Sequence, residues 1–138
     1  MSRFVLDSYA VLAVIREEAG AARVLDLITD LRHQHWMSVI NVGEVYYQKA
    51  RDEDVMSADR ALAWLQSTSI RIVDVDLITT IEAARIKTTH PVSYADCFAA
   101  ALAREMQARV VTGDPEFAIL ERDNIVAIEW LPAKPRRR

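Results

Sequence analysis

The most constraining feature of this chain is the alternation of short Val- and Ile-rich runs with longer segments of helical periodicity. The runs lie at residues 3–7, 36–40, 70–73, 109–112 and 125–128. They lack regular polar alternation, which is typical of strands covered on both faces. Strands that alternate with one or two helices predict an α/β fold, a three-layer α/β/α sandwich around a mostly parallel sheet of about five strands.

Apolar residues recur at helical spacing between these runs, in residues 24–31, 58–65, 77–84 and 95–106. The third of these segments places Leu77, Ile78, Ile81 and Ala84 at the spacing of a helix with one apolar face. The fourth segment is apolar nearly all round, so we expect a central, buried helix there.

Length and composition indicate one globular domain. The chain has 138 residues, of which 51% are hydrophobic and 27% charged, the profile of a soluble protein rather than a disordered one. We expect a single domain over residues 1–133 and a disordered basic tail over residues 134–138. The net charge of -3 argues mildly against a dedicated nucleic-acid binder, which usually presents a basic surface.

Three observations favour a cytoplasmic protein. No apolar stretch approaches the roughly 18 residues that a membrane span needs. The N-terminus passes directly into a predicted strand, so we expect no secretory signal. Cys97 is the single cysteine, which excludes an internal disulfide and fits a reducing compartment.

Four acidic residues lie where a predicted strand passes into a predicted helix, or close after that point: Asp7, Glu44, Asp96 and Asp114. The carboxyl ends of parallel strands lie along one edge of a sheet, which is where ligands bind in open α/β folds. Four carboxylates gathered there repel each other unless a divalent cation neutralises them. Oxygen ligands suit Mg²⁺ or Mn²⁺, and such a site is suited to phosphodiester hydrolysis.

A purely structural interpretation exists for each acid. Asp7 and Asp114 are suited to capping a helix, and Asn41-x-x-Glu44 and Ser93-x-x-Asp96 resemble capping boxes. Two observations favour the metal site. A carboxylate on the buried helix that begins near Asp96 is costly to desolvate without a counter-charge, and Gly113 beside Asp114 leaves room for a ligand.

At these residues the chain resembles the PIN-domain ribonucleases, and specifically the VapC-type toxins of bacterial toxin–antitoxin pairs. The matching segments are FVLDSYAVLA, NVGEVYYQ, VSYADCFAAALA and VVTGDPEF, in this order over nearly the whole length. The resemblance implies a metal-dependent endoribonuclease of PIN-like fold that is a homodimer and is neutralised by a small cognate antitoxin.

The resemblance also implies roles for single residues. Asp7, Glu44, Asp96 and Asp114 are the implied catalytic acids, and Mg²⁺ or Mn²⁺ is held by Asp7, Asp96 and Asp114. Two hydroxyl residues support the site: Thr112 matches a supporting position after a strand, and Ser8 matches the residue that orients the first carboxylate. Water activated by the metal is the implied nucleophile toward RNA.

Two other functions stay open at this point. A Mg²⁺-dependent phosphatase or phosphoreceiver also places Asp at strand ends, but it needs a nucleophilic Asp and a lysine after a late strand, and no lysine follows Val110 and Val111. A non-catalytic RNA- or protein-binding module of the same fold is the second alternative, although all four acids are present.

Overall fold

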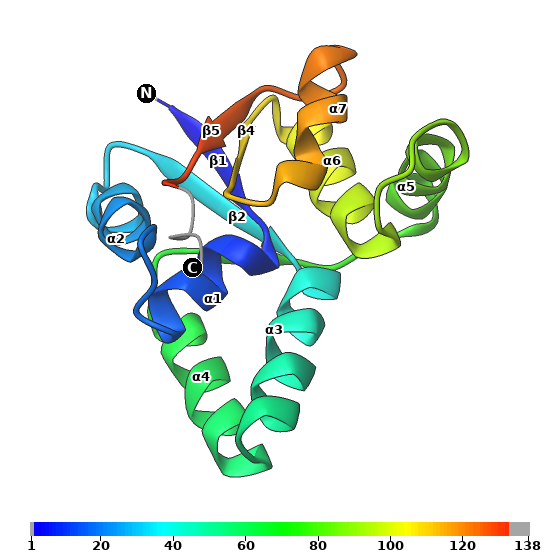
Figure 1. Cartoon of the computed structure of the whole chain (residues 1–138). Coiled ribbons are helices and arrows are strands. Elements are labelled where there is room, and N and C mark those ends of the chain that lie inside the picture. The colour runs from blue at the N-terminus through cyan, green and yellow to red at the C-terminus, as the bar shows by residue number, and fades with distance from the viewer. Residues whose placement is uncertain (1, 133–138) are drawn as a thin grey trace, which may run out of the picture.

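A computed structural model describes residues 2–132 of the chain. Its sheet has five strands, all parallel, in the order β3-β2-β1-β4-β5, with β1 at the centre (Figure 1). The strands are β1 (Arg3–Leu6), β2 (Gln34–Ser38), β3 (Arg71–Val73), β4 (Arg109–Thr112) and β5 (Ile128–Trp130). The predicted α/β class and parallel sheet are confirmed, and the strand order, which the sequence left open, is now defined.

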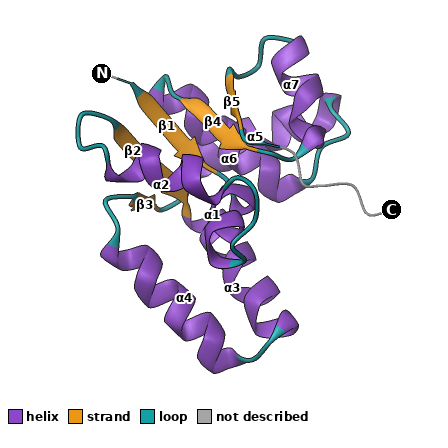
Figure 2. Cartoon of the chain, turned by 60° about the vertical axis from the view of Figure 1, so that its left-hand side comes forward, coloured by secondary structure: helices purple, strands orange, loops and turns teal. Residues whose placement is uncertain are grey.

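Helices cover both faces of this sheet, as Figure 2 shows. Buried side chains of α1, α2, α3 and α4 pack on one face and those of α5, α6 and α7 on the other. The helices are α1 (Ser8–Ile15), α2 (Ala21–Thr29), α3 (Val39–Asp52), α4 (Val55–Ser67), α5 (Leu77–Thr89), α6 (Tyr94–Met106) and α7 (Ala118–Arg122), with a 3₁₀ turn, η1, at Pro115–Phe117.

The central strands explain why polar alternation is missing from the sequence. In β1, Leu6 joins the core shared with α1 and α2, whereas Val5 joins the core shared with α6. Val110 and Val111 of β4 divide in the same way. Successive strand residues point to opposite faces, so a sheet covered on both faces needs apolar residues at successive positions.

The second and the last strand differ most from their predicted bounds. The second strand ends at Ser38 rather than Ile40, because Ser38 is the N-cap of α3 and its side chain accepts a hydrogen bond from the Ile40 amide. The β-branched pair Val39-Ile40 therefore begins a helix. The last strand runs over Ile128–Trp130 instead of residues 125–128, because Asn124, with a φ of 57°, ends the preceding turn and Ile125 and Val126 pack on the core from a loop.

The predicted central helix and the helix over the third segment, α5, are confirmed, but much of the apolar face of α5 is exposed. Residues 96–103 of α6 are all buried. In α5 the buried residues are Ala83 and Ile86, while Leu77 and Ile78 are 75% and 81% exposed. Helical spacing identifies an apolar face, but it does not show whether the rest of the chain covers that face.

The remaining predictions about organisation concern the ends of the chain and membranes. The predicted basic tail at 134–138 lies outside the described residues, as does the predicted domain end at 133. Among the helices of residues 2–132, none combines the length and apolar character that crossing a membrane requires.

Replacement of two leucines tests the orientation of α5 relative to α6. Leu102→Ala removes a buried side chain of α6 and should lower the free energy of unfolding by about 2–5 kcal/mol. Leu77→Ala removes the same atoms from an exposed position and should change it by less than about 0.5 kcal/mol. Urea unfolding followed by circular dichroism measures both. Equal losses would show that Leu77 is buried in solution.

Candidate metal centre

Three of the four predicted acids converge at the edge where the strands end. Asp7 follows β1 and caps α1, where its Oδ1 accepts a hydrogen bond from the Ala10 amide at 2.9 Å. Asp114 follows the neighbouring strand β4 and caps η1. Asp96 lies in the first turn of α6. The pKa shifts described below show that Asp7, Asp96 and Asp114 sense one another's charge.

Thr112 connects two of these acids. Its hydroxyl donates a hydrogen bond to Asp7 Oδ2 and accepts one from the Asp114 amide at 3.0 Å. The side chain is fully buried. The Thr112 hydroxyl at the end of β4 thus holds two groups in place: the Asp7 carboxylate, which follows β1, and the Asp114 amide in the turn after β4.

Ser8 and Glu44 form a second pair on the same side of the sheet. The Ser8 hydroxyl donates to Glu44 Oε1 at 2.5 Å. This corrects the expectation that Ser8 orients Asp7, whose two carboxylate oxygens are already bonded to Thr112 and Ala10. The pair joins the first turn of α1 to α3, so Glu44 is held at the wall of the site.

Of the two expected capping boxes, the one that begins at Asn41 is wrong and the one that begins at Ser93 is incomplete. Because Ser38 caps α3, Asn41 lies inside its first turn, where Nδ2 donates to the Ala95 carbonyl at 3.1 Å. Ser93 does cap α6 and accepts from the Asp96 amide at 3.3 Å. Its own amide, however, donates to Glu116 Oε1 at 3.0 Å. The Asp96 carboxylate is therefore left to face the other acids.

Glu116 is the site residue that sequence reasoning missed. It lies two residues after Asp114, and its amide donates to Asp114 Oδ1 at 2.9 Å. One carboxylate oxygen from each of Asp96, Asp114 and Glu116 lies within 4.8 Å of the others. The signal in the sequence was the second acid in the turn after β4, which on its own is indistinguishable from an ordinary acidic first turn.

Burial and mutual repulsion hold protons on these acids. Desolvation, together with the charges of Asp114 and Glu44, raises the pKa of Asp7 to about 7 against the hydrogen bonds from Thr112 and Ala10. Desolvation is also the main cause that raises the pKa of Asp96, followed by a hydrogen bond shared with Glu116 and the charge of Asp7. Without a counter-charge, the site is therefore partly protonated near neutral pH.

The donor set fits a hard divalent cation. All candidate ligands are carboxylate oxygens, which Mg²⁺ and Mn²⁺ prefer. A bound cation would supply the positive charge that the raised pKa values show to be missing from the surrounding protein. The oxygens of Asp96, Asp114 and Glu116 are near enough to share one ion, while Asp7 lies beside them with both of its oxygens hydrogen-bonded.

The acids open into a cleft of about 310 Å³. Its lining residues come from the α1–α2 segment, α3, the start of α6 and the turn after β4: Ser8, Tyr9, Leu12, Arg16, Glu18, Glu44, Gln48, Ser93, Asp96, Asp114 and Glu116. The space beside Gly113 is not open to a ligand, contrary to expectation. A Cβ there would lie 2.7 Å from Tyr9 Cζ, so glycine is needed for the close packing of the Tyr9 ring.

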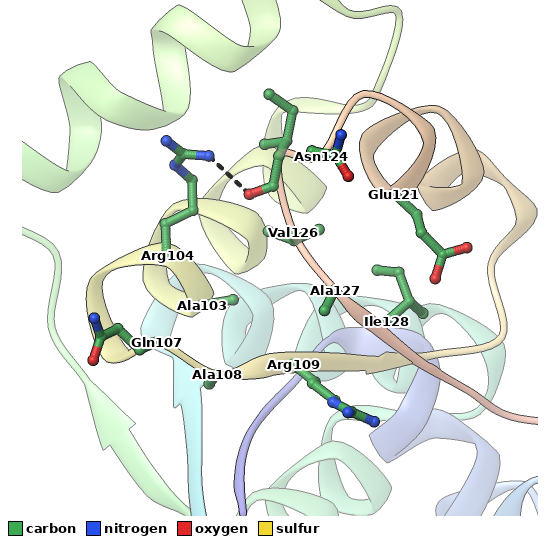
Figure 3. Close-up of a pocket in the computed structure, with 11 residues that line it drawn as sticks. Ala103, Arg104, Gln107, Ala108, Arg109, Glu121, Asn124, Val126, Ala127 and Ile128 are labelled. Carbon is green, nitrogen blue, oxygen red and sulfur yellow. Dashed lines mark hydrogen bonds between the residues drawn. The ribbon is translucent and has the colours of Figure 1, made fainter.

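A larger cavity of about 600 Å³ lies away from the acids. Figure 3 shows it between the end of α6, the start of β4 and the segment that leads into β5. Arg104 at its rim donates to the Ile125 carbonyl at 2.8 Å. Because Arg109 begins β4 and the acids follow the strand ends, this cavity is at the opposite edge of the sheet.

Comparison with known families and structures agrees with this architecture. The family model of the PIN domain matches residues 4–123. Comparison with curated protein sequences gives no match.

Several solved structures of toxin–antitoxin proteins share the fold at low sequence identity. A chain of VapBC2 from Rickettsia felis, bound to a DNA fragment from its promoter, superposes with a TM-score of 0.75 at 16% identity, covering 94% of this chain and 99% of that one. VapC20 of Mycobacterium tuberculosis, a toxin that cleaves the sarcin–ricin loop, gives 0.71 at 17%, with 96% and 99% covered. DNA-bound VapBC from Salmonella typhimurium gives 0.72 at 21%, with 94% and 98% covered.

The raised pKa of Asp7 makes the stability of metal-free protein depend on pH. Between about pH 4 and about pH 7, folded Asp7 retains a proton that the unfolded chain has lost, so its contribution to stability falls as pH rises. Buried His35, whose pKa is lowered by desolvation, acts in the opposite direction. The difference between wild type and Asp7→Asn therefore isolates the carboxyl.

We expect Asp7→Asn to be more stable than metal-free wild type at pH 8, by at least about 1 kcal/mol, and this advantage to shrink at pH 5. Thermal unfolding in a chelating buffer measures it. Mn²⁺ should restore wild-type stability at pH 8 and have little effect at pH 5. A pH-independent difference between the two proteins would contradict the assigned protonation.

Proposed function

Because the chain belongs to the PIN-domain family, we propose that it is a metal-dependent endoribonuclease that acts as the VapC-type toxin of a toxin–antitoxin pair. The observation that carries this proposal is the cluster of acids at the strand ends, in which carboxylate oxygens of Asp96, Asp114 and Glu116 lie within 4.8 Å of one another. A hard cation beside an open cleft is suited to phosphodiester hydrolysis. VapC20 of Mycobacterium tuberculosis, a toxin of similar fold that cleaves the sarcin–ricin loop, supports the choice of RNA as the substrate.

We propose that Asp7, Asp96 and Asp114 bind the metal and that Glu116 is an additional ligand. Glu44 is a catalytic carboxylate in the wall of the cleft. Thr112 holds Asp7 in place, and Ser8 holds Glu44. When bound, Mg²⁺ or Mn²⁺ lowers the pKa of a coordinated water and screens the charge that develops on the phosphate. The side chains set the position of the phosphate relative to that water, and no protein nucleophile is required.

The environment of Asp7 argues against the phosphatase or phosphoreceiver alternative. Such an enzyme attacks phosphorus with an exposed carboxylate oxygen. Asp7 is only 1% exposed, and each of its oxygens accepts a hydrogen bond. The cleft is also lined by no lysine among the described residues. Treatment with a phosphoryl donor should therefore leave no acid-stable, base-labile phosphate on the chain.

The non-catalytic binding module is the second alternative, and metal affinity separates it from the nuclease. A nuclease needs a competent metal site, and all the acids of this site are present. Calorimetry should detect Mn²⁺ binding at millimolar concentration or below. A folded protein that fails to bind Mn²⁺ would favour the binding module.

The proposed partners are a small cognate antitoxin and a second copy of the chain, both in the cytoplasm. The solved VapBC structures of the same fold support the antitoxin. Two groups of exposed apolar side chains support protein partners: Leu77, Ile78 and Ile81 on α5, and Tyr47, Val55 and Met56 on α3 and α4. Exposed apolar surface of this kind is typical of protein–protein contacts.

Asp96→Asn tests the nuclease directly. The change keeps the shape of the side chain but removes one carboxylate from the proposed ligand set. We expect Mg²⁺- or Mn²⁺-dependent cleavage of total tRNA and rRNA by antitoxin-free protein to fall at least about 100-fold, and growth arrest on expression to disappear.

The matched control is Asp76→Asn. Asp76 caps α5, where it accepts from the Thr79 amide, and it does not line the cleft. This variant should retain wild-type cleavage. Cleavage by Asp96→Asn at the wild-type rate would refute the assignment of Asp96. Absence of cleavage by wild-type protein that binds Mn²⁺ would restrict the proposal to an RNA outside the tested set.

Glu116→Gln tests the ligand that the sequence did not reveal. Its carboxylate has two roles in the structure: it accepts a hydrogen bond from the Ser93 amide, and it belongs to the acidic cluster. Glutamine keeps an oxygen for the amide but loses the charge. We expect calorimetry to show Mn²⁺ affinity reduced about 10- to 100-fold, with the melting temperature of metal-free protein unchanged or raised.

Glu121→Gln is the control for this measurement, because Glu121 accepts from Trp130 Nε1 outside the cleft. Its Mn²⁺ affinity should equal that of wild type. Unchanged affinity in Glu116→Gln would leave this residue with a capping role alone.

A further inference from the structure

The wall of the cleft formed by α1 and α3 carries a row of polar contacts. At one end Ser8 donates to Glu44. Two helical turns further along both helices, Arg16 Nη2 contacts Asp52 Oδ2 at 2.8 Å, and it also contacts Oε1 of Gln48, one turn beyond Glu44, at 3.4 Å. Eight residues of α-helix span roughly 12 Å, so the backbone of Arg16 lies about that far along α1 from the backbone of Ser8.

Arg16 is positively charged in a cleft whose other charged lining residues are acidic. Five acidic side chains line it: Glu18, Glu44, Asp96, Asp114 and Glu116. Within the described part of the chain, Arg16 is the single cationic residue in the lining. At one end of the cleft, a bound cation would neutralise the acids and so reduce their repulsion of an approaching polyanion. At the far end, the positive charge comes from the Arg16 guanidinium.

The backbone fixes the position of Arg16, whereas its side chain is held weakly. Arg16 is the C-cap of α1, and its amide donates to the Leu12 carbonyl at 2.8 Å. The Arg16–Asp52 pair is half exposed, with 31% and 47% of the two side chains accessible. Exposed ion pairs of this kind contribute little to stability, so another anion can replace Asp52 at small cost.

We infer that Arg16 binds a phosphate of the RNA other than the cleaved one, and that Asp52 occupies the guanidinium until RNA replaces it. This inference rests on the proposed nuclease function. The planar guanidinium matches a phosphate in two-point geometry. Its separation along α1 from the end of the cleft that holds the acids places it on a phosphate beyond the cleaved one, so it sets how the strand lies in the cleft and takes no part in bond cleavage.

The test measures RNA binding separately from cleavage. In an Asp96→Asn background, a fluorescein-labelled oligouridylate is titrated by fluorescence anisotropy at several salt concentrations. Arg16→Gln should weaken binding about ten-fold at low salt and reduce the slope of log Kd against log salt by about 0.7, the value for one phosphate contact on a single strand. In cleavage-competent protein, the same change should raise KM more than it lowers kcat.

Asp52→Asn gives the opposite sign and separates this role from a structural one. Removing the competing carboxylate should tighten binding of the oligouridylate by about two- to three-fold. If the pair merely joins α1 to α3, both variants should lose stability alike and neither should bind RNA more tightly. Arg51→Gln is the charge-matched control, because Arg51 is exposed on α3 and packs over the Tyr47 ring, outside the cleft.

The outcomes distinguish this inference from the proposed function. Metal-dependent cleavage by wild type, together with unchanged binding and salt slope in Arg16→Gln, would overturn the role of Arg16 and leave the nuclease in place. Weaker binding in Asp52→Asn would overturn it as well. Absence of cleavage by wild type on every RNA would refute the nuclease, whatever the Arg16 variant does to binding.

Discussion

Burial of carboxylates at the carboxyl edge of the sheet is the constraint on which the rest of this structure depends. Asp7 follows the central strand and is almost inaccessible, and Asp96 lies on the most buried helix. An ionised carboxylate in such a place is costly unless it is paired with a cation or hydrogen-bonded. Within residues 2–132 the protein supplies hydrogen bonds for Asp7 and no cationic side chain beside either acid, which is why we propose that a metal ion neutralises the charge.

The hydrogen bonds around the acids are shared between capping and positioning. Asp7 and Asp114 each cap the element that follows them, so the structural interpretation of these residues is confirmed, and capping is compatible with the metal-binding role that we propose for them. Thr112 and Ser93 extend this arrangement, because each contacts a residue from a distant part of the chain. Asp7 and Asp114 thus stabilise the ends of the elements that hold them in place. The mutually repelling carboxylates therefore keep one arrangement.

Much of the fold was predictable because its determinants are local. Strands covered on both faces must be apolar at successive positions, and α6 is apolar all round because it is buried all round. The errors arose where local pattern was ambiguous. Val39 and Ile40 suit either a strand or the first turn of a helix, and Ser38 decides between them by capping. The apolar residues of α5 suit either a core or an exposed surface, and only the packing of α6 against Ala83 and Ile86 shows which.

The sequence by itself determined the class of the fold and the edge at which the acids lie, because parallel strands end together and each acid follows close on a strand or begins a buried helix. Tertiary structure decided the order of the strands, the partner of Ser8, the entry of Glu116 into the cluster and the place of Arg16 along the cleft. These contacts join residues that the order of the chain does not bring together. They depend on the docking of whole helices, which a local pattern of residues does not specify.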